Sequence, residues 1–259
     1  MICPRILFFL LAASFVTAAN NDAPANASHA IMPVPAETQA RRPQQVAPPQ
    51  KGERIVFIGN GLAERDVHYS RLETELHLRY PDHELFVRNM GHVGDTPGFR
   101  PHPSRKTQWA FPGAEKFHPD KMTHNGKGFF PMPDEWLAFL KADTIVAFFG
   151  YNESFDGPSK VKNFEDELDA WVIHTLSRAY NGESAPRLVL VSPIAYENQS
   201  AKRDLPDGEK ENANLILYSA AIETVAKKHG LTFVDLFSTT KALYATAKEP
   251  LTTKGFVPN

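Results

Sequence analysis

Short apolar runs, each followed by a turn of glycine and asparagine, most constrain what this chain can fold into. Three of these runs are Ile55–Ile58, Leu85–Val87 and Thr144–Phe149. Continuous apolar runs of this length are typical of strands in a parallel sheet that is covered on both faces. Ligands of open α/β sheets bind just beyond the carboxyl ends of the strands, so the turns after these runs should meet at one crevice.

Amphipathic segments alternate with these strands. In the segment Val161–Tyr180, for example, Phe164, Leu168 and Trp171 recur at the spacing of one helical face. The alternation predicts a three-layer α/β/α sandwich with a five-stranded parallel sheet in flavodoxin-like order. The other predicted elements are helices at about Arg65–Arg79, Glu135–Leu140 and Glu209–His229, and strands at Arg187–Val191 and Thr232–Val234.

The first 19 residues are typical of a secretory signal peptide. Arg5 provides a positive flank, Ile6–Val16 is apolar, and Thr17-Ala18-Ala19 offers small residues for cleavage. The apolar stretch is too short to span a bilayer comfortably, so a retained anchor is less favoured. We therefore expect residues 1–19 to be removed and the protein to be exported, to the periplasm or outside the cell. Cys3 is the sole cysteine and would leave with the signal, which excludes disulfides and cysteine nucleophiles from the mature protein.

Two segments lack a regular apolar pattern. Residues 20–52 are rich in alanine, proline and glutamine and predict a disordered linker before a folded domain at residues 53–259. Residues 95–134 form a long stretch rich in proline and aromatic side chains, and loops of this length are usually functional or disordered. We expect a folded lid over the crevice; an insertion that only pads the domain is the alternative.

Charge and histidine spacing exclude several classes of ligand. The formal net charge of -2 gives no reason to expect a nucleic acid or an anionic membrane as partner. Basic residues outnumber acidic ones between residues 97 and 134, which could attract an anionic substrate or could simply be solvated. His102, His118 and His124 match no metal-ligand spacing, so neither a metal nor a cofactor is predicted.

The turns after the strands resemble sequence blocks of the SGNH (GDSL-type) hydrolase superfamily. Gly59-Asn60-Gly61 stands where these proteins carry Gly-Asp-Ser with the serine nucleophile. Asn89-Met90-Gly91, continued by Gly94-Asp95-Thr96, resembles the block whose glycine N–H helps to form the oxyanion hole. Gly150-Tyr151-Asn152-Glu153 resembles Gly-x-Asn-Asp, whose asparagine is another donor. The resemblance runs from about Arg54 to the end of the chain, and the stretch from Trp109 through Asn152 is similar in particular to a bacterial exported subgroup.

This resemblance implies a hydrolase of carboxylic or carbohydrate esters, with a small-molecule or glycan ester as its ligand. It also implies an oxyanion pocket formed by Asn60, Gly91, Asn152 and Glu153, because amide donors can stabilise the oxygen that becomes negative during acyl transfer. Two further segments follow a predicted strand at the same edge and could line this pocket, Ser192-Pro193 and Glu197.

The residues that carry the chemistry of SGNH hydrolases are nevertheless replaced. Gly61 occupies the nucleophile position, and Lys254 and Val257 occupy the aspartate and histidine positions of the last block. Covalent ester cleavage needs a nucleophile, a base that takes its proton and a group that orients the base. No position of the standard triad is therefore intact, and the oxyanion donors alone give only residual catalysis.

Three explanations of these substitutions stay open. In the first, the sequence ends early or leaves its frame near Lys254, which accounts for the missing aspartate and histidine but not for Gly61. In the second, Ser154 or Thr96 is the nucleophile and His92 is the base, although each of these side chains could instead make local loop hydrogen bonds. In the third, the protein is a pseudoenzyme that binds an ester or a glycan without cutting it.

Overall fold

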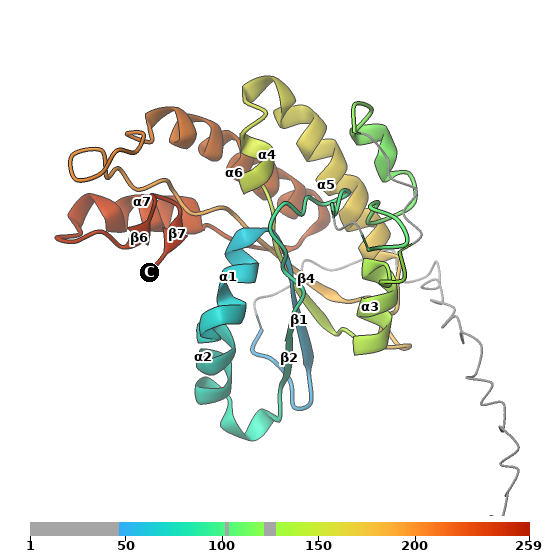
Figure 1. The fold of residues 1–259 in the computed structure, drawn as a ribbon. Coiled ribbons are helices and arrows are strands. Elements are labelled where there is room, and N and C mark those ends of the chain that lie inside the picture. The colour runs from blue at the N-terminus through green and yellow to red at the C-terminus, as the bar shows by residue number, and fades with distance from the viewer. Residues whose placement is uncertain (1–46, 102–103, 122–127) are drawn as a thin grey trace, which may run out of the picture.

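The computed structural model describes residues 47–101, 104–121 and 128–259, which form an α/β fold around one parallel sheet. Figure 1 shows the fold as a ribbon. The strand order is β2-β1-β3-β4-β5, which confirms the predicted flavodoxin-like order. The strands are β1 (Arg54–Gly59), β2 (Phe86–Asn89), β3 (Thr144–Phe148), β4 (Arg187–Val191) and β5 (Thr232–Val234).

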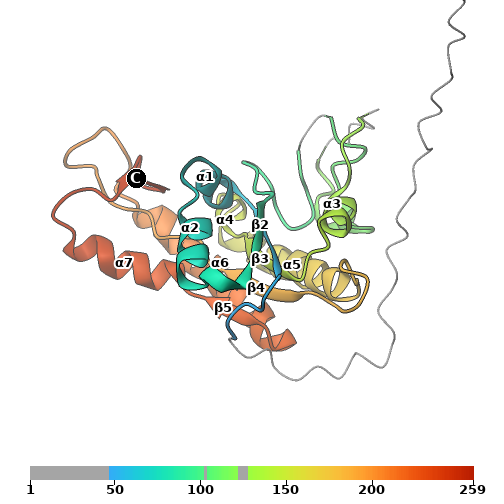
Figure 2. The same cartoon turned by 90° about the horizontal axis from the view of Figure 1, so that it is seen from below.

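Helices cover both faces of the sheet and make the three layers. The helices are α1 (Gly61–Tyr69), α2 (Arg71–Arg79), α3 (Pro133–Leu140), the single turn α4 (Tyr151–Ser154), α5 (Val161–Leu176), α6 (Glu209–His229) and α7 (Leu236–Thr246). Figure 2 shows α1 and α2 on one side of the strands and α3 and α5 on the other.

Alternate side chains of β1 enter the two halves of the core. Val56 and Ile58 belong to the larger apolar cluster, which also takes in residues of α3, α5 and α6. Ile55 and Phe57 belong to a smaller cluster with Ala63 of α1. The strand is thus buried on both faces, which explains why its sequence is a continuous apolar run.

The predicted helix Arg65–Arg79 is two helices in the structure. Helix α1 begins earlier, because the Asn60 side chain caps it by accepting a hydrogen bond from Leu62 N at 3.1 Å. The break falls at Ser70, whose φ of 48° is left-handed and whose N–H donates to Asp66 O. The Asp66 side chain also accepts from Leu72 N, so this aspartate closes one helix and helps to start the next.

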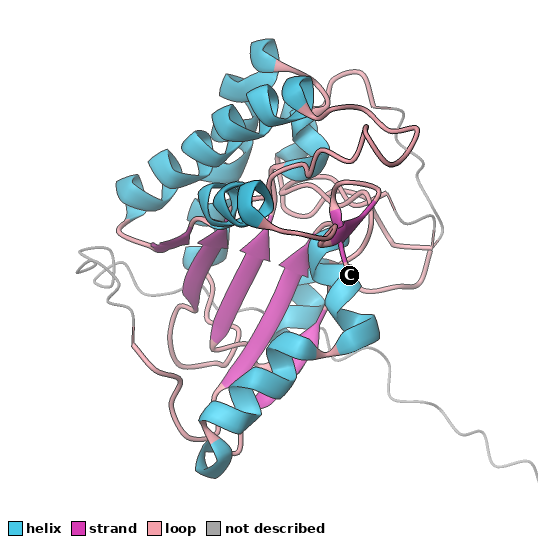
Figure 3. Cartoon of the chain, turned by 90° about the vertical axis from the view of Figure 1, so that its left-hand side faces the viewer, coloured by secondary structure: helices cyan, strands magenta, loops and turns pink. Residues whose placement is uncertain are grey.

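The remaining elements differ from prediction mainly at their ends. Strand β2 lies one to two residues later than Leu85–Val87, and α5 ends at Leu176 rather than at Tyr180. Helix α7 and the C-terminal hairpin of β6 (Thr252–Thr253) and β7 (Val257–Pro258) were not predicted. Figure 3 shows this hairpin at the edge of the sheet toward which the strand arrows point.

The lid segment, residues 95–134, is held by hydrogen bonds within itself and to helix α5. Arg100 Nη1 donates to Asp95 Oδ2 at 2.7 Å, and both side chains are buried. Glu167 of α5 accepts from Gly98 N at 2.8 Å and lies 2.6 Å from His118 Nε2. These long-range bonds fix the lid segment against α5.

The predicted signal peptide and most of the predicted linker lie outside the described residues. The described end of that linker, residues 47–52, lies against the start of the sheet. Arg187 Nη1 donates to Ala47 O at 3.0 Å, and Gly52 N donates to His83 O at 2.6 Å. None of the helices within the described ranges is long and apolar enough to cross a membrane.

Candidate functional site

A cavity of about 290 Å³ lies at the edge of the sheet where the strands end. We call it the edge cavity. It is lined by residues from the turns after β1, β3 and β4 and from the C-terminal hairpin, among them Gly61, Asn152, Ser192, Phe256 and Val257. Turns that are far apart in the sequence therefore meet at one place, and Ser192-Pro193 lines it as predicted.

The nucleophile position, Gly61, is the first residue of α1 and faces this cavity. A Cβ atom placed on Gly61 would meet only Val93 Cγ2, at 3.5 Å, which is an ordinary van der Waals contact. Asn60 also lines the cavity, but its side chain is occupied as the cap of α1. The site thus has room for a side chain at residue 61 and carries no hydroxyl there.

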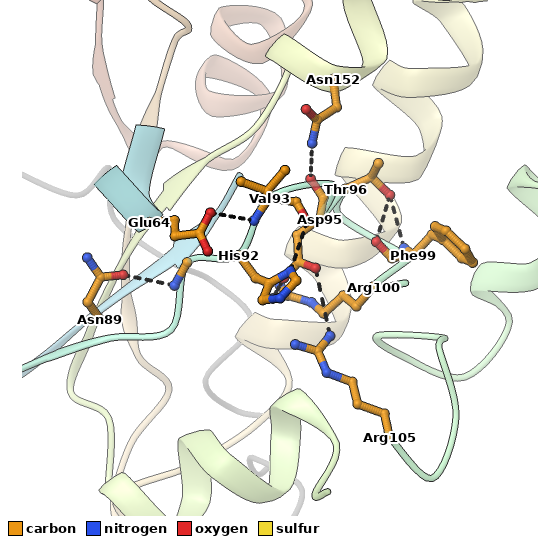
Figure 4. A network of polar contacts seen from close by, with 11 residues as sticks. Glu64, Asn89, His92, Val93, Asp95, Thr96, Phe99, Arg100, Arg105 and Asn152 are labelled. Atoms are coloured by element: carbon orange, nitrogen blue, oxygen red, sulfur yellow. Dashed lines mark hydrogen bonds and ion pairs between the residues drawn. The ribbon is translucent and has the colours of Figure 1, made fainter. Parts of the chain in front are cut away.

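Gly91 lies outside the residues that line the edge cavity, and its N–H is used within its own loop. It donates to Asn89 Oδ1 at 2.8 Å (Figure 4). A Cβ atom on Gly91 would come within 2.6 Å of Ala63 Cβ and Glu64 N. Glycine is therefore required here for close packing of the loop on α1. The Gly91 N–H, which was predicted to serve the oxyanion hole, is therefore already hydrogen-bonded and is not available to a ligand.

Asn152 projects from α4 toward the loop after β2. Its Nδ2 donates to Asp95 O at 2.9 Å, which Figure 4 shows from close by. Asn152 lines the edge cavity and also a second cavity under the lid segment. The amide that the resemblance assigns to oxyanion binding is therefore already aimed at a carbonyl oxygen.

Glu153, the neighbour of Asn152, is buried on the side of the second cavity. Its Oε2 accepts from Gly150 N at 2.9 Å. Burial, together with the nearby Glu167 carboxylate, raises the pKa of Glu153 to about 8. Glu153 is thus largely a neutral acid at neutral pH and does not line the edge cavity.

The three weaker candidates from the sequence make local contacts. Ser154 Oγ donates to Tyr151 O at 2.7 Å, and Thr96 Oγ1 accepts from Phe99 N at 3.0 Å. His92 Nδ1 lies 2.8 Å from Val93 O. None of the three lines the edge cavity, so the geometry gives no support to a substitute nucleophile–base pair made from them.

The C-terminal hairpin contains the two residues that the resemblance assigns to the other triad positions. Val257 lines the edge cavity, whereas Lys254 is exposed in the turn of the hairpin with a φ of 65°. Neither residue can relay a proton from residue 61 as the triad requires. A valine side chain carries no proton acceptor, and the lysine lies outside the cavity.

Glu197, which the sequence placed at the pocket, holds the hairpin instead. Its carboxylate accepts from Leu251 N at 2.9 Å and from Thr252 N at 2.8 Å. Partial burial of Glu197 opposes ionisation, but the hydrogen bonds from Thr252 and Leu251 lower its pKa below the usual value. The hairpin that forms one wall of the edge cavity therefore depends on a carboxylate from the loop after β4.

Sequence reasoning missed three polar residues of α1 that line the edge cavity: Glu64, Arg65 and His68. Glu64 and His68 are four residues apart and share one face of the helix. Glu64 Oε2 also accepts from Val93 N at 3.0 Å. The signal that could have found them is the capping asparagine at residue 60, which fixes where α1 begins.

Sequence comparison finds no relatives: no protein-family model matches the chain, and no curated protein does. Comparison of structures, in contrast, finds proteins with a similar fold. A catalytic mutant of Axe2, an acetylxylan esterase from Geobacillus stearothermophilus, aligns with a TM-score of 0.54 at 15% identity, over 82% of this chain and 90% of that one. The chain shares the α/β fold of this esterase.

Other solved structures share this fold. LAE5, an α/β hydrolase enzyme from the metagenome of Lake Arreo in Spain, aligns with a TM-score of 0.53 at 17% identity, over 81% of this chain and 89% of that one. BT4096, a gut microbial diltiazem-metabolizing enzyme, aligns with a TM-score of 0.51 at 17% identity, over 84% of this chain but only 46% of that one. At these identities the similarity concerns the fold and not the chemistry.

Proposed function

We propose that this esterase-like protein binds a small carboxylic or carbohydrate ester in the edge cavity and does not cleave it through a covalent intermediate. The observation that carries the proposal is that Gly61, Asn152 and Val257 line one cavity at the ends of the strands. An ester would find an amide donor there, but no nucleophile at residue 61 and no base at residue 257. Neighbours of this fold that act on acetylated xylan support an ester as the ligand.

The Asn152 amide is the group that would recognise the ester carbonyl. It lies 2.9 Å from Asp95 O, so its N–H is already directed at an oxygen of the same kind. Tyr151 and Phe256 stack with ring centroids 5.3 Å apart and give the cavity an aromatic wall. Apolar walls with a few directed polar groups are typical of small-ligand sites.

Direct hydrolysis by water is the second candidate, and one observation favours it. Glu64 and His68 line the same cavity and could take a proton from a water molecule that attacks the ester carbonyl. In that step the water oxygen bonds to the carbonyl carbon, the alcohol leaves with a proton, and no acyl-enzyme forms.

Titration with p-nitrophenyl acetate separates the two candidates. We expect the ester to bind, as followed by chemical-shift changes at Phe256 and Val257, with release of p-nitrophenol no faster than in buffer. Turnover that is lost in Glu64→Gln or His68→Ala would establish the second candidate. Absence of both binding and turnover would contradict the proposal itself.

We also propose that the protein acts outside the cytoplasm, on the strength of the signal-like residues 1–19. N-terminal sequencing of protein from the medium or periplasm should begin between Ala19 and Asn21. Recovery of chains that still begin at Met1 would contradict export by this route.

A further inference from the structure

A second cavity, of about 500 Å³, lies between the lid segment and helices α4, α5 and α6. We call it the lid cavity. Only a thin partition separates it from the edge cavity: Val93 lines the edge cavity, Gly94 lines the lid cavity, and Asn152 lines both. The hydrogen bond from Asn152 Nδ2 to Asp95 O closes this partition. A ligand that replaces Asp95 O at Asn152 Nδ2 could therefore reach into both cavities.

One residue that lines the lid cavity carries a buried polar atom that no described protein group satisfies. Glu153 lines the cavity and is 6% exposed. Its Oε2 accepts from Gly150 N, whereas Oε1 has no hydrogen-bond partner within the described part of the chain. A buried polar group without a partner costs stability unless a ligand or water satisfies it. Because its pKa is raised, the carboxyl group can offer a proton to a ligand oxygen.

The charges around the lid cavity nearly balance. The carboxyl groups that line it belong to Asp120, Glu153, Asp156 and Glu167, and the basic groups to His118, Lys121 and Lys160. The His118 ring already contacts Glu167, and Glu153 is largely protonated at neutral pH. This mixture favours neither an anion nor a cation. The described residues also contain no group of three or more ligands that could hold a metal ion.

The walls combine aromatic rings with groups that both donate and accept hydrogen bonds. Phe99, Phe117 and Phe164 line the cavity together with the amide side chains of Asn152 and Asn163. His118 is fixed by Glu167 and stacks on Trp109 at 5.9 Å between ring centroids. A sugar ring has apolar C–H faces and hydroxyl groups that donate and accept, so it matches such walls better than a purely apolar ligand does.

We propose that the lid cavity binds a neutral saccharide unit, with Asp156, Asn163 and Glu153 as hydrogen-bonding groups and the phenylalanine rings as its apolar wall. This inference rests on the proposed function, because it assigns the ligand of the edge cavity to the carbohydrate esters. The acyl group would lie on the Gly61 side of Asn152 and the sugar on the Glu153 side.

Binding of unesterified sugars tests this assignment without involving the edge cavity. The probes are xylotriose, cellotriose and mannotriose, titrated by calorimetry and by the fluorescence of Trp109, which stacks on His118. We expect at least one to bind, and Asp156→Ala to weaken that binding by about tenfold or more, the loss expected for a hydrogen bond to a charged group. The matched control is Asp166→Ala, because Asp166 is exposed on α5 and pairs with Lys162 away from the cavity. It should bind like the wild type.

Failure of this inference and failure of the proposed function give different results. Val257→Trp should fill the edge cavity and abolish binding of p-nitrophenyl acetate, while sugar binding stays unchanged. If none of the three trisaccharides binds, or if Asp156→Ala and Asp166→Ala behave alike, the saccharide site is wrong even when the ester binds. Equal binding of trigalacturonate would show that the site does not select neutral sugars.

Discussion

The edge cavity and the lid cavity share Asn152 but differ in what surrounds it. The edge cavity is lined by two residues that the sequence resemblance assigns to triad positions, Gly61 and Val257, and neither side chain can move a proton. The lid cavity was not predicted from the sequence, yet it is lined by the buried residues Glu153 and Glu167. Buried carboxyl groups therefore line the lid cavity, whereas the titratable side chains of the edge cavity, Glu64, Arg65 and His68, are not buried.

The largest effect should come from the carboxylate that anchors the lid segment. Glu167 is 1% exposed and binds Gly98 N and His118 Nε2, so Glu167→Ala leaves buried donors without a partner. We expect a loss of about 3–5 kcal/mol in the free energy of unfolding, measured in urea, as for other broken buried pairs. The control Glu223→Ala removes an exposed pair with Lys227 and should cost less than about 0.5 kcal/mol. Equal losses would mean that the lid segment is not anchored there.

The second largest effect should come from placing a nucleophile and a base in the edge cavity. The double variant Gly61→Ser, Val257→His places a hydroxyl and an imidazole in the edge cavity, where residue 61 has room for a side chain. We expect hydrolysis of p-nitrophenyl acetate to rise by about a hundredfold, the lower range for a positioned base. Gly61→Ser alone is the control and should gain much less. A folded double variant with no gain would show that these positions do not face one ester.

The third prediction concerns the pH dependence that Glu153 gives to stability. Its pKa in the folded protein is raised to about 8, so the folded state holds a proton that the unfolded state loses near pH 4.5. Stability should therefore fall as the pH rises from about 4.5 to 8, by at most about 1.4 kcal/mol for each pH unit, and level off above 8. Glu153→Gln should flatten this profile in urea unfolding. An unchanged slope would indicate that Glu153 is ionised in the folded protein.

The smallest effect is the difference in stability between two glycine-to-alanine variants, which separates the cost of backbone strain from the cost of packing at the hairpin wall. Gly255 and Gly113 have φ values of 85° and 86°, but a Cβ atom on Gly255 would lie 2.4 Å from Tyr196 Cζ, whereas one on Gly113 meets nothing within 4 Å. Gly113→Ala should cost only the strain of a left-handed alanine, about 1 kcal/mol. Gly255→Ala should cost about 1–3 kcal/mol more, from overpacking. Equal melting temperatures would mean that the hairpin packs loosely on Tyr196.

The fold was readable from the sequence where local signals and burial agree. Strand β4, helix α6 and strand β5 have the predicted bounds, because apolar runs and helical spacing there are unambiguous. The break between α1 and α2 was missed, since it depends on Asp66 bonding to two later backbone groups. Helix α7 was also missed, although Asp235, which accepts from Ser238 N, is a readable N-cap.

The candidate site was only partly predictable for a physical reason. Turns after parallel strands must meet at one edge, so the joint location of Gly61 and Asn152 follows from the order of the strands. The strand order does not show which N–H groups remain available to a ligand, because the acceptor of each N–H depends on how its loop folds. Asn89 occupies the N–H of Gly91, and Asp95 O occupies the amide of Asn152.

The bond between Asn152 and Asp95 also decides how selective the shared wall of the two cavities can be. The Asn152 amide carries two N–H groups, and Asp95 O accepts from one of them. An acyl oxygen could accept from the other while the loop stays in place, whereas an alkane would bring no acceptor at all. A compound long enough to lie on both sides of Asn152 would in addition have to break the bond to Asp95, so chain length as well as polarity should decide which molecules can extend past it.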